Sequence, residues 1–234
     1  MPSLKDLKLQ INSVGSTKKI TSAMKMVAAS KLRRSQEKAE AARPYSSRLE
    51  EMLSSLSSAN VSNEGIMRLL SGTGKKENYL IIPVTADRGL CGGFNSSINR
   101  ETFKYIKKLE SQNKKVNIIT VGKKCRDFFN RMMKDKIIEN YTDLGAAGAG
   151  YDIALNISNK VQKLYFENNF DICVFVYNKF KSAIVQEVTH QQLIPLESLE
   201  DEKKNEKKQI EDKKEDNSIY IYEPDEKSIL QDLL

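Results

Sequence analysis

The fold is decided by the stretch "YLIIPVTADRGLCGGFN" at residues 79–95. Its first eight residues are an apolar, β-branched run typical of a buried strand, and a glycine-rich turn follows directly. Asn95 or Ser96 can then cap a helix that continues through "NRETFKYIKKLES" at 99–111. A strand, a turn and a helix in this order indicate an α/β fold.

Strand and helix patterns continue to alternate downstream of this stretch. The last two predicted strands are joined around Lys181 and Ser182, which is too short a connection for a parallel crossover. We therefore expect a mainly parallel sheet covered by helices, with one antiparallel pair at its end. Apolar runs predict strands at 116–122, 136–145, 171–180 and 183–195, and amphipathic segments predict helices at 125–133 and 151–167.

Upstream of the stretch, residues 3–58 are mostly good helix formers, with Gly15 and Pro44 as the only strong breakers. Leu4, Leu7, Ile11 and Val14 follow the spacing of one helical face. A helix of about 55 residues would run roughly 80 Å, which exceeds the roughly 35–45 Å width of a small domain. Part of it must protrude or pair with another long element, and Pro44 is expected to kink or interrupt it.

Positive charge is concentrated in the first 36 residues. The whole chain carries a formal charge of +7, and residues 1–36 hold eight cations against Asp6 alone, so the remainder is neutral overall. The segment "SAMKMVAASKLRR" at 22–34 has no carboxylate, although an exposed helix normally gains from Glu–Lys pairs four residues apart. A standing acidic partner would explain the pattern. Nucleic acid is the alternative, but aromatic residues for stacking are missing from residues 1–44.

The glycine-rich turn is the strongest candidate for chemistry. Gly89, Gly92 and Gly93 do not fit the dinucleotide-binding or P-loop patterns, so a structural turn is favoured over a phosphate cradle. "GAAGAG" at 145–150 also has the wrong order of glycines. Asp87 and Arg88 can form either a charged functional contact or a solvated loop tip.

The sequence lacks a complete set of residues for a metal site or for catalysis. Cys91, Cys125 and Cys173 are far apart in sequence, and His190 is the only histidine, so no zinc set is predicted. The cysteines are expected to be buried or idle thiols in a reducing compartment. We predict no catalytic, cofactor-binding or metal-binding residues, and no apolar run reaches the roughly 20 residues of a membrane span.

The chain changes character near its end. "EDEKKNEKKQIEDKKEDN" at 200–217 is charged and of low complexity, as solvated linkers are. A short strand and a helix opening at Pro224 are expected after it. The predicted organisation is a shaft helix at 1–60, an α/β foot domain at 76–197, a charged linker at 198–217, and the strand with the start of a C-terminal helix at 218–234.

Four segments together resemble one family. "INSVGSTKKITSAMKMVAASKLRRSQ" at 11–36, "ARPYSSRL" at 42–49, "DRGLCGGFN" at 87–95 and "YIYEPD" at 220–225 look like the γ subunit of F-type ATP synthases, the central rotor shaft. The resemblance runs in order over essentially the whole chain. It implies a long N-terminal helix as half of a coiled-coil shaft plus a Rossmann-like α/β domain.

The resemblance also implies partners and a function. In this family the coiled coil occupies the bore of a ring of three α and three β subunits, while the foot sits on the c-ring and binds ε. The chain would be a non-catalytic rotor subunit of a proton-translocating synthase, peripheral on the cytoplasmic side of the bacterial plasma membrane or the matrix side of the mitochondrial inner membrane, without nucleic acid. The alternatives are a nucleotide-responsive α/β module and a basic coiled-coil nucleic-acid binder.

The family positions transfer to three sets of residues. The family also continues past residue 234 into the second shaft helix, so we expect the chain to be a fragment, with a shortened variant as the alternative, and its seam from Leu4 to Leu32 to be bare. The three sets are Lys19, Ile20, Met24, Lys25 and Lys31 facing β subunits on the shaft; Asp87, Arg88, Gly89, Cys91, Gly92, Gly93 and Asn95 in a loop facing the α/β ring; and Tyr220, Tyr222 and Glu223 on the foot facing the c-ring and ε.

Overall fold

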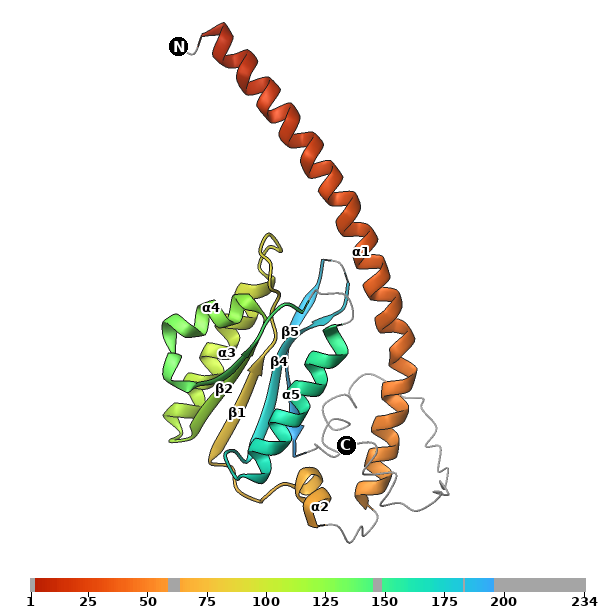
Figure 1. Cartoon of the computed structure of the whole chain (residues 1–234), viewed down its shortest axis with the longest axis vertical. Helices are drawn as coiled ribbons and strands as arrows, with labels where there is room; N and C mark the ends of the chain where they lie inside the picture. The colour runs from red at the N-terminus through yellow and green to blue at the C-terminus, as the bar shows by residue number, and fades with distance from the viewer. Residues whose placement is uncertain (1–2, 59–63, 145–148, 183, 196–234) are drawn as a thin grey trace. The chain divides into compact units, whose positions relative to one another are not determined.

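The computed structural model describes residues 3–58, 64–144, 149–182 and 184–195 (Figure 1). These residues form two compact units, one ending at Ser55 and the other containing the rest of the described chain. The predicted linker at 198–217 and the strand and helix at 218–234 lie outside the described residues.

The first unit is formed by a single long helix, α1 (Leu4–Ser58, 55 residues). Its first turn is closed by a reciprocal cap, in which the Asp6 amide donates to Ser3 Oγ at 3.3 Å and the Ser3 amide donates to Asp6 Oδ2 at 3.1 Å. Of the kink or interruption predicted at Pro44, the interruption is wrong, because the helix continues through this residue. Proline removes only one amide donor, and the long helical stretches on both sides hold the chain in register.

The second unit is an α/β domain, as predicted. Its five-stranded sheet has the order β3-β2-β1-β4-β5, in which only the β4–β5 pair is antiparallel. The short helix α2 was not predicted. The elements are α2 (Glu64–Ser71), β1 (Asn78–Pro83), α3 (Phe94–Ser111), β2 (Lys115–Val121), α4 (Lys123–Met132), a 3-10 turn (Lys134–Lys136), β3 (Ile137–Tyr141), α5 (Ala149–Phe166), β4 (Ile172–Phe180) and β5 (Gln186–Ile194).

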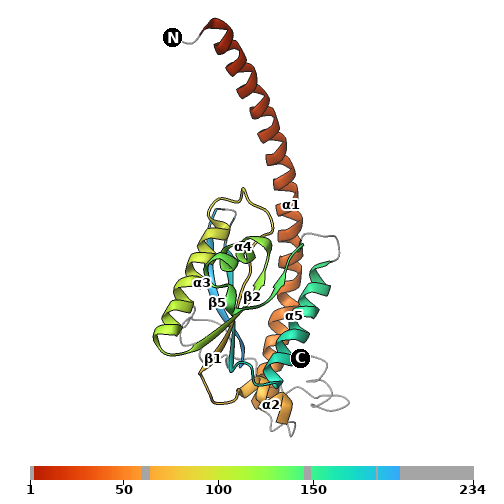
Figure 2. The same cartoon turned by 60° about the vertical axis from the view of Figure 1, so that its left-hand side comes forward.

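Helices cover both faces of this sheet (Figures 1 and 2). Ile81 packs with residues of α3 and α4, including Ile106 and Phe129, whereas its neighbours Leu80 and Ile82 pack against α5 on the opposite face. Successive strand residues point to opposite faces, and both faces are buried here. That is why β1 reads as a continuous apolar run instead of an alternating one.

The carboxyl end of β1 lies at a topological switch point. The chain moves from β1 to β2 and β3 on one side of the sheet and returns to β4 on the other side. In open α/β sheets the loops at such a point are the usual ligand-binding position. The glycine-rich turn follows β1 at this position.

A buried carboxylate anchors the opposite end of β1. Asp171 is only 7% exposed, and its Oδ2 accepts hydrogen bonds from the backbone amides of Asn78 at 2.9 Å and Glu77 at 3.1 Å. Thr73 Oγ1 donates to Oδ1 at 3.2 Å. Burial alone would raise the pKa of this carboxyl, but the hydrogen bonds outweigh burial and lower it. Asp171 therefore ties the segment before β1 to the start of β4.

Candidate functional site

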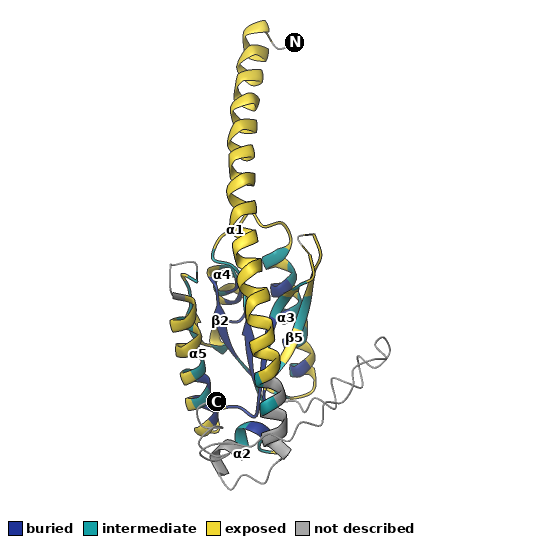
Figure 3. Ribbon diagram, turned by 90° about the vertical axis from the view of Figure 1, so that its right-hand side faces the viewer, coloured by how far each residue is buried: buried dark blue, intermediate teal, exposed yellow. Residues whose placement is uncertain are grey.

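The surface of α1 is open along most of its length. Every residue from Ser3 to Arg48 is exposed (Figure 3). The predicted apolar seam shares this exposure: Leu4 is 79% exposed, Ile11 69% and Met24 53%. The described residues therefore leave this seam uncovered, which is the surface that a coiled-coil partner requires.

The cations of α1 are also largely unpaired within the described chain. Arg33 forms an ion pair with Glu37 at 2.9 Å, four residues along. Within the same helix, the Thr17 hydroxyl donates a hydrogen bond to the Ser13 carbonyl oxygen, and the Thr21 hydroxyl donates one to the Thr17 carbonyl oxygen. The cations of α1 that make no ion pair with a described residue are Lys5, Lys8, Lys18, Lys19, Lys25, Lys31, Arg34, Lys38 and Arg43.

The five predicted shaft residues do not share one face. At roughly 100° per residue, Ile20, Met24 and Lys31 lie within about 40° of one another around the helix. Lys19 and Lys25 lie on the two sides of that stripe. The basic surface therefore surrounds much of the helix.

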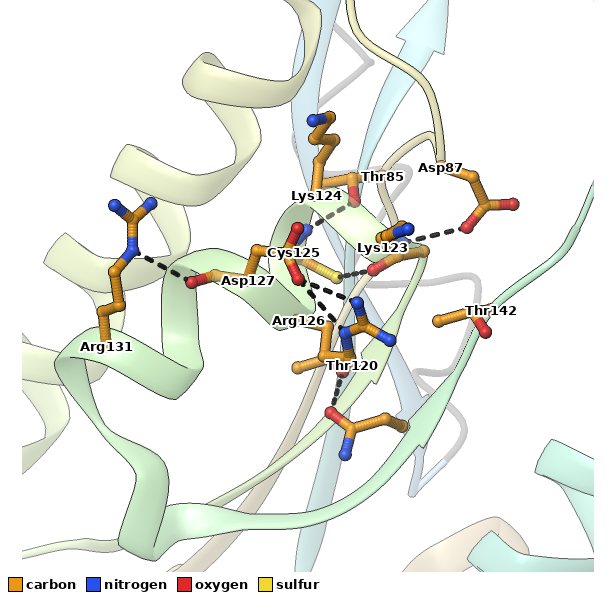
Figure 4. A network of polar contacts seen from close by, with 12 residues as sticks. Thr85, Asp87, Thr120, Lys123, Lys124, Cys125, Arg126, Asp127, Arg131 and Thr142 are labelled. Atoms are coloured by element: carbon orange, nitrogen blue, oxygen red, sulfur yellow. Dashed lines mark hydrogen bonds and ion pairs between the residues drawn. The ribbon is translucent and has the colours of Figure 1, made fainter.

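Asp87 fixes the loop after β1 (Figure 4). Its Oδ1 accepts a hydrogen bond from the backbone amide of Lys123 at 2.9 Å, and its Oδ2 accepts one from that of Leu144 at 2.8 Å. The loop is thereby joined to the start of α4 and to the segment after β3. Of the two interpretations of Asp87, the solvated loop tip is wrong, because its carboxylate is a structural clamp.

Asn95 shapes the rest of the loop. Its Oδ1 accepts from the Ala86 amide at 3.0 Å, and its Nδ2 donates to the Arg88 carbonyl oxygen at 3.2 Å and to Cys91 Sγ at 3.0 Å. The predicted capping of α3 by Asn95 or Ser96 is wrong: the cap residue is Gly93, without a side-chain bond, and Asn95 is used across the loop instead.

The loop presents Arg88 and Leu90 at its tip. Both are exposed, and Leu90 is 98% exposed in a left-handed backbone conformation, with φ of 61°. Leu90 was not among the predicted site residues, and its position inside a glycine-rich turn is the only sequence signal that marks it. Leu90 is therefore open to contact with another protein.

The amino end of α4 has no free amide donors for a phosphate. The amides of its first three residues donate to Asp87, to the Ala86 carbonyl at 3.3 Å and to Thr85 Oγ1 at 2.9 Å. Gly122 precedes them with φ of 99°, and a Cβ there would lie 2.2 Å from the Thr85 carbonyl oxygen. The Asp87 carboxylate already accepts from the first of these amides, so this helix end offers no open donor to a phosphate.

Comparison with known proteins identifies the family. A family model described as ATP synthase matches residues 3–234. The ATP synthase γ chain of Paramagnetospirillum magneticum is 47% identical over 234 residues, covering all of this chain and 77% of that protein, and the γ chain of Rhodospirillum rubrum is 46% identical, covering all of this chain and 78% of that protein. The chain belongs to the ATP synthase γ chain family.

A solved structure supports the same assignment. A chain in the cryo-EM structure of the central stalk and c-ring of the Tetrahymena thermophila mitochondrial ATP synthase is 30% identical, with a TM-score of 0.55, and the match covers 75% of this chain and 72% of that one. The expected family fold, a long helix and an α/β domain, is therefore confirmed.

The predicted foot contacts and the three cysteines of this γ chain remain to be placed. Tyr220, Tyr222 and Glu223 lie outside the described residues. Cys125 and Cys173 are buried, and burial raises the pKa of both thiols, so they are protonated at neutral pH. Cys91 is exposed.

No group of three or more histidine, cysteine, aspartate or glutamate side chains in the described chain is placed to hold a metal ion. Within the same residues, no helix is both long and apolar enough to cross a membrane.

Proposed function

We propose that this γ chain is the central-stalk rotor subunit of a proton-translocating F-type ATP synthase. It couples rotation of the c-ring to conformational change at the nucleotide sites of the β subunits. The observation that carries the proposal is α1 in a chain of this family: 55 helical residues with an exposed apolar seam and nine cations that make no ion pair with a described residue. A helix of this kind is built to be surrounded by other subunits.

The partners are the α and β subunits of the catalytic ring, the ε subunit and the c-ring. The related Tetrahymena chain comes from a structure of a central stalk and c-ring. The chain is peripheral to the membrane, on the cytoplasmic side of a bacterial plasma membrane. The mitochondrial inner membrane, on its matrix side, is the alternative location.

The shaft acts by differential contact. As it turns inside a ring of pseudo-threefold symmetry, each β subunit meets a different side of α1 at each step. A face that contacts one β conformation more favourably than another shifts the population of that subunit among its nucleotide-binding states. Because Lys19 and Lys25 flank the stripe of Ile20, Met24 and Lys31, successive β subunits meet different combinations of charged and apolar surface.

The loop after β1 forms a second contact, with the ring of α and β subunits. Arg88 and the flanking glycines Gly89, Gly92 and Gly93 make this contact together with Cys91. Asp87 and Asn95 act as positioning residues, because their side chains are already used to hold the loop. Tyr220, Tyr222 and Glu223 are assigned to the c-ring and ε contact on family grounds alone.

The chain itself is proposed to be non-catalytic. Phosphoryl transfer depends on positioned phosphate-binding groups and a metal ion, and the amide donors at the amino end of α4 are already bonded within the protein. These bonds weigh against phosphate binding at the amino end of α4. In the proposed assembly, nucleotide chemistry belongs to the β subunits.

Charge reversal on the shaft tests the proposal. In membranes carrying the assembled enzyme, Lys25→Glu with Lys31→Glu should lower ATP-driven proton pumping per ATP hydrolysed, because two cations that face acidic β surfaces become repulsive. The matched control is Lys163→Glu with Lys179→Glu, two exposed lysines of the foot domain. An unchanged pumping ratio in the shaft variant would refute the electrostatic role.

A further inference from the structure

The amino-terminal edge of the sheet carries a polar depression that the rotor function does not use. It has a volume of about 650 Å³ and lies at the starts of β1 and β2, beside the 3-10 turn and the turn that follows α5. This basic pocket is lined by Lys114, Lys115, Lys136, Asn78, Asn117 and Asn168, among others.

The lining is rich in donors and cations. Three lysines converge on the basic pocket, and no carboxylate is among its described lining residues. Asn168 accepts a hydrogen bond from Arg68 through Oδ1 at 2.7 Å. Among the described residues no acceptor pairs with the side-chain NH₂ of Asn168 or of Asn117. Such a surface selects a hydrophilic anion.

The positive charges of the lysines around the basic pocket are only partly balanced by carboxylates. Glu110 pairs with both Lys107, at 2.9 Å, and Lys136, so one carboxylate serves two cations. Lys114 and Lys115 make no ion pair with any described residue. Burial, together with the nearby charge of Lys107, lowers the pKa of Lys136. An anion in the basic pocket would relieve this repulsion and favour the charged form of Lys136.

We propose that the basic pocket binds the phosphate group of a phosphate-bearing ligand, with Lys114, Lys115 and Lys136 as its cationic contacts. Lysine binds phosphate as a point charge, and amide NH₂ groups supply further donors. The walls expose little apolar surface, so the recognised part of the ligand is its phosphate and not a ring or a chain. The source is either a soluble phosphate compound or the headgroup of an anionic phospholipid.

Binding measurements on the full chain distinguish the two sources. In one arm, pyrophosphate is titrated into the protein and followed by calorimetry. In the other arm, sedimentation is measured with vesicles of phosphatidylcholine, with and without phosphatidylglycerol. The variant is Lys114→Gln with Lys115→Gln, which leaves the Lys136–Glu110 pair intact. The control is Lys163→Gln with Lys179→Gln, which removes the same charge from exposed positions elsewhere on the domain.

The control is needed because the basic surface of α1 also attracts anions. If the site is the basic pocket, the Lys114/Lys115 variant binds roughly tenfold more weakly or worse, and the control binds like the native chain. Loss confined to the pyrophosphate arm assigns a soluble phosphate, whereas loss confined to the phosphatidylglycerol arm assigns the lipid headgroup. Equal binding by the two variants in both arms, or no binding in either, would overturn the proposal. Because the site belongs to the foot domain alone, this result is independent of the rotor function.

Discussion

The carboxylate of Asp87 lies 2.9 Å from the backbone nitrogen of Lys123, the first residue of α4, and accepts its hydrogen bond. The second oxygen of the same carboxylate accepts from Leu144 at 2.8 Å. One side chain thus joins the loop after β1, the start of α4 and the segment after β3. The loop proposed to face the α/β ring is held by an interaction that resembles a helix cap.

Replacement of Asp87 by alanine should therefore lower the free energy of unfolding by about 1–2 kcal/mol, the usual cost of losing a cap. Urea denaturation would measure the change, and hydrogen exchange at the amides of residues 123–125 should accelerate. Asp127→Ala is the control, because Asp127 makes only a partly exposed ion pair with Arg126. Equal losses in the two variants would mean that Asp87 is not a clamp.

Asp171 makes the stability of the folded chain depend on pH in the acidic range. Since its pKa in the folded chain is held below the ordinary value of 3.8, its contribution is complete above that value and is lost as pH falls through the folded pKa. Asp171→Asn should be less stable than the native chain at pH 7, and the difference should shrink as pH falls below about 4. Urea unfolding from pH 7 downward tests this, and a pH-independent difference would contradict it.

His190 makes the stability of the folded chain depend on pH closer to neutrality. Its ring stacks on Tyr105 with centroids 4.8 Å apart, and burial lowers its pKa below 6.5 although Glu101 opposes the shift. The neutral form is favoured in the folded chain, so stability should decline as pH falls below about 6.5. His190→Gln should remove that component of the pH profile. Glu101→Gln should enlarge it, because the opposing charge is gone, and thermal unfolding between pH 8 and pH 5 would record both.

Substitution by alanine should lower stability at one glycine and raise it at another. At Gly122, φ of 99° and a Cβ position 2.2 Å from the Thr85 carbonyl oxygen predict a loss of more than about 2 kcal/mol. Gly15 lies in α1 with nothing within 4 Å of its Cβ position, so alanine should raise helix stability by roughly 0.5–1 kcal/mol. Circular dichroism during thermal unfolding distinguishes the two, and an unimpaired Gly122→Ala chain would refute the close approach.

Local patterns were sufficient to predict most of the fold. The apolar runs located all five strands, and the tight connection around Lys181 correctly predicted the antiparallel pair. The long helix was predicted by composition and by the near absence of breakers. These features succeed because strand and helix periods are properties of neighbouring residues.

Features that depend on distant residues were missed. Asp171 bonds to Asn78, 93 residues earlier in the chain, and Asp87 bonds to Lys123 and Leu144; no spacing rule connects such pairs. The assignment of Asn95 as a helix cap failed for a different reason, because the neighbouring loop offered its side chain other partners. The basic pocket is also formed by segments that only the sheet brings together.

Single-molecule rotation tests the central claim most directly. A bead would be attached to a cysteine introduced at Lys163, an exposed position on α5, with the exposed Cys91 replaced by serine. The chain would be assembled with α and β subunits that are fixed to a surface. The rotor account predicts unidirectional, stepwise rotation of the bead when ATP is supplied. A bead that stays still while the same assembly hydrolyses ATP would contradict it.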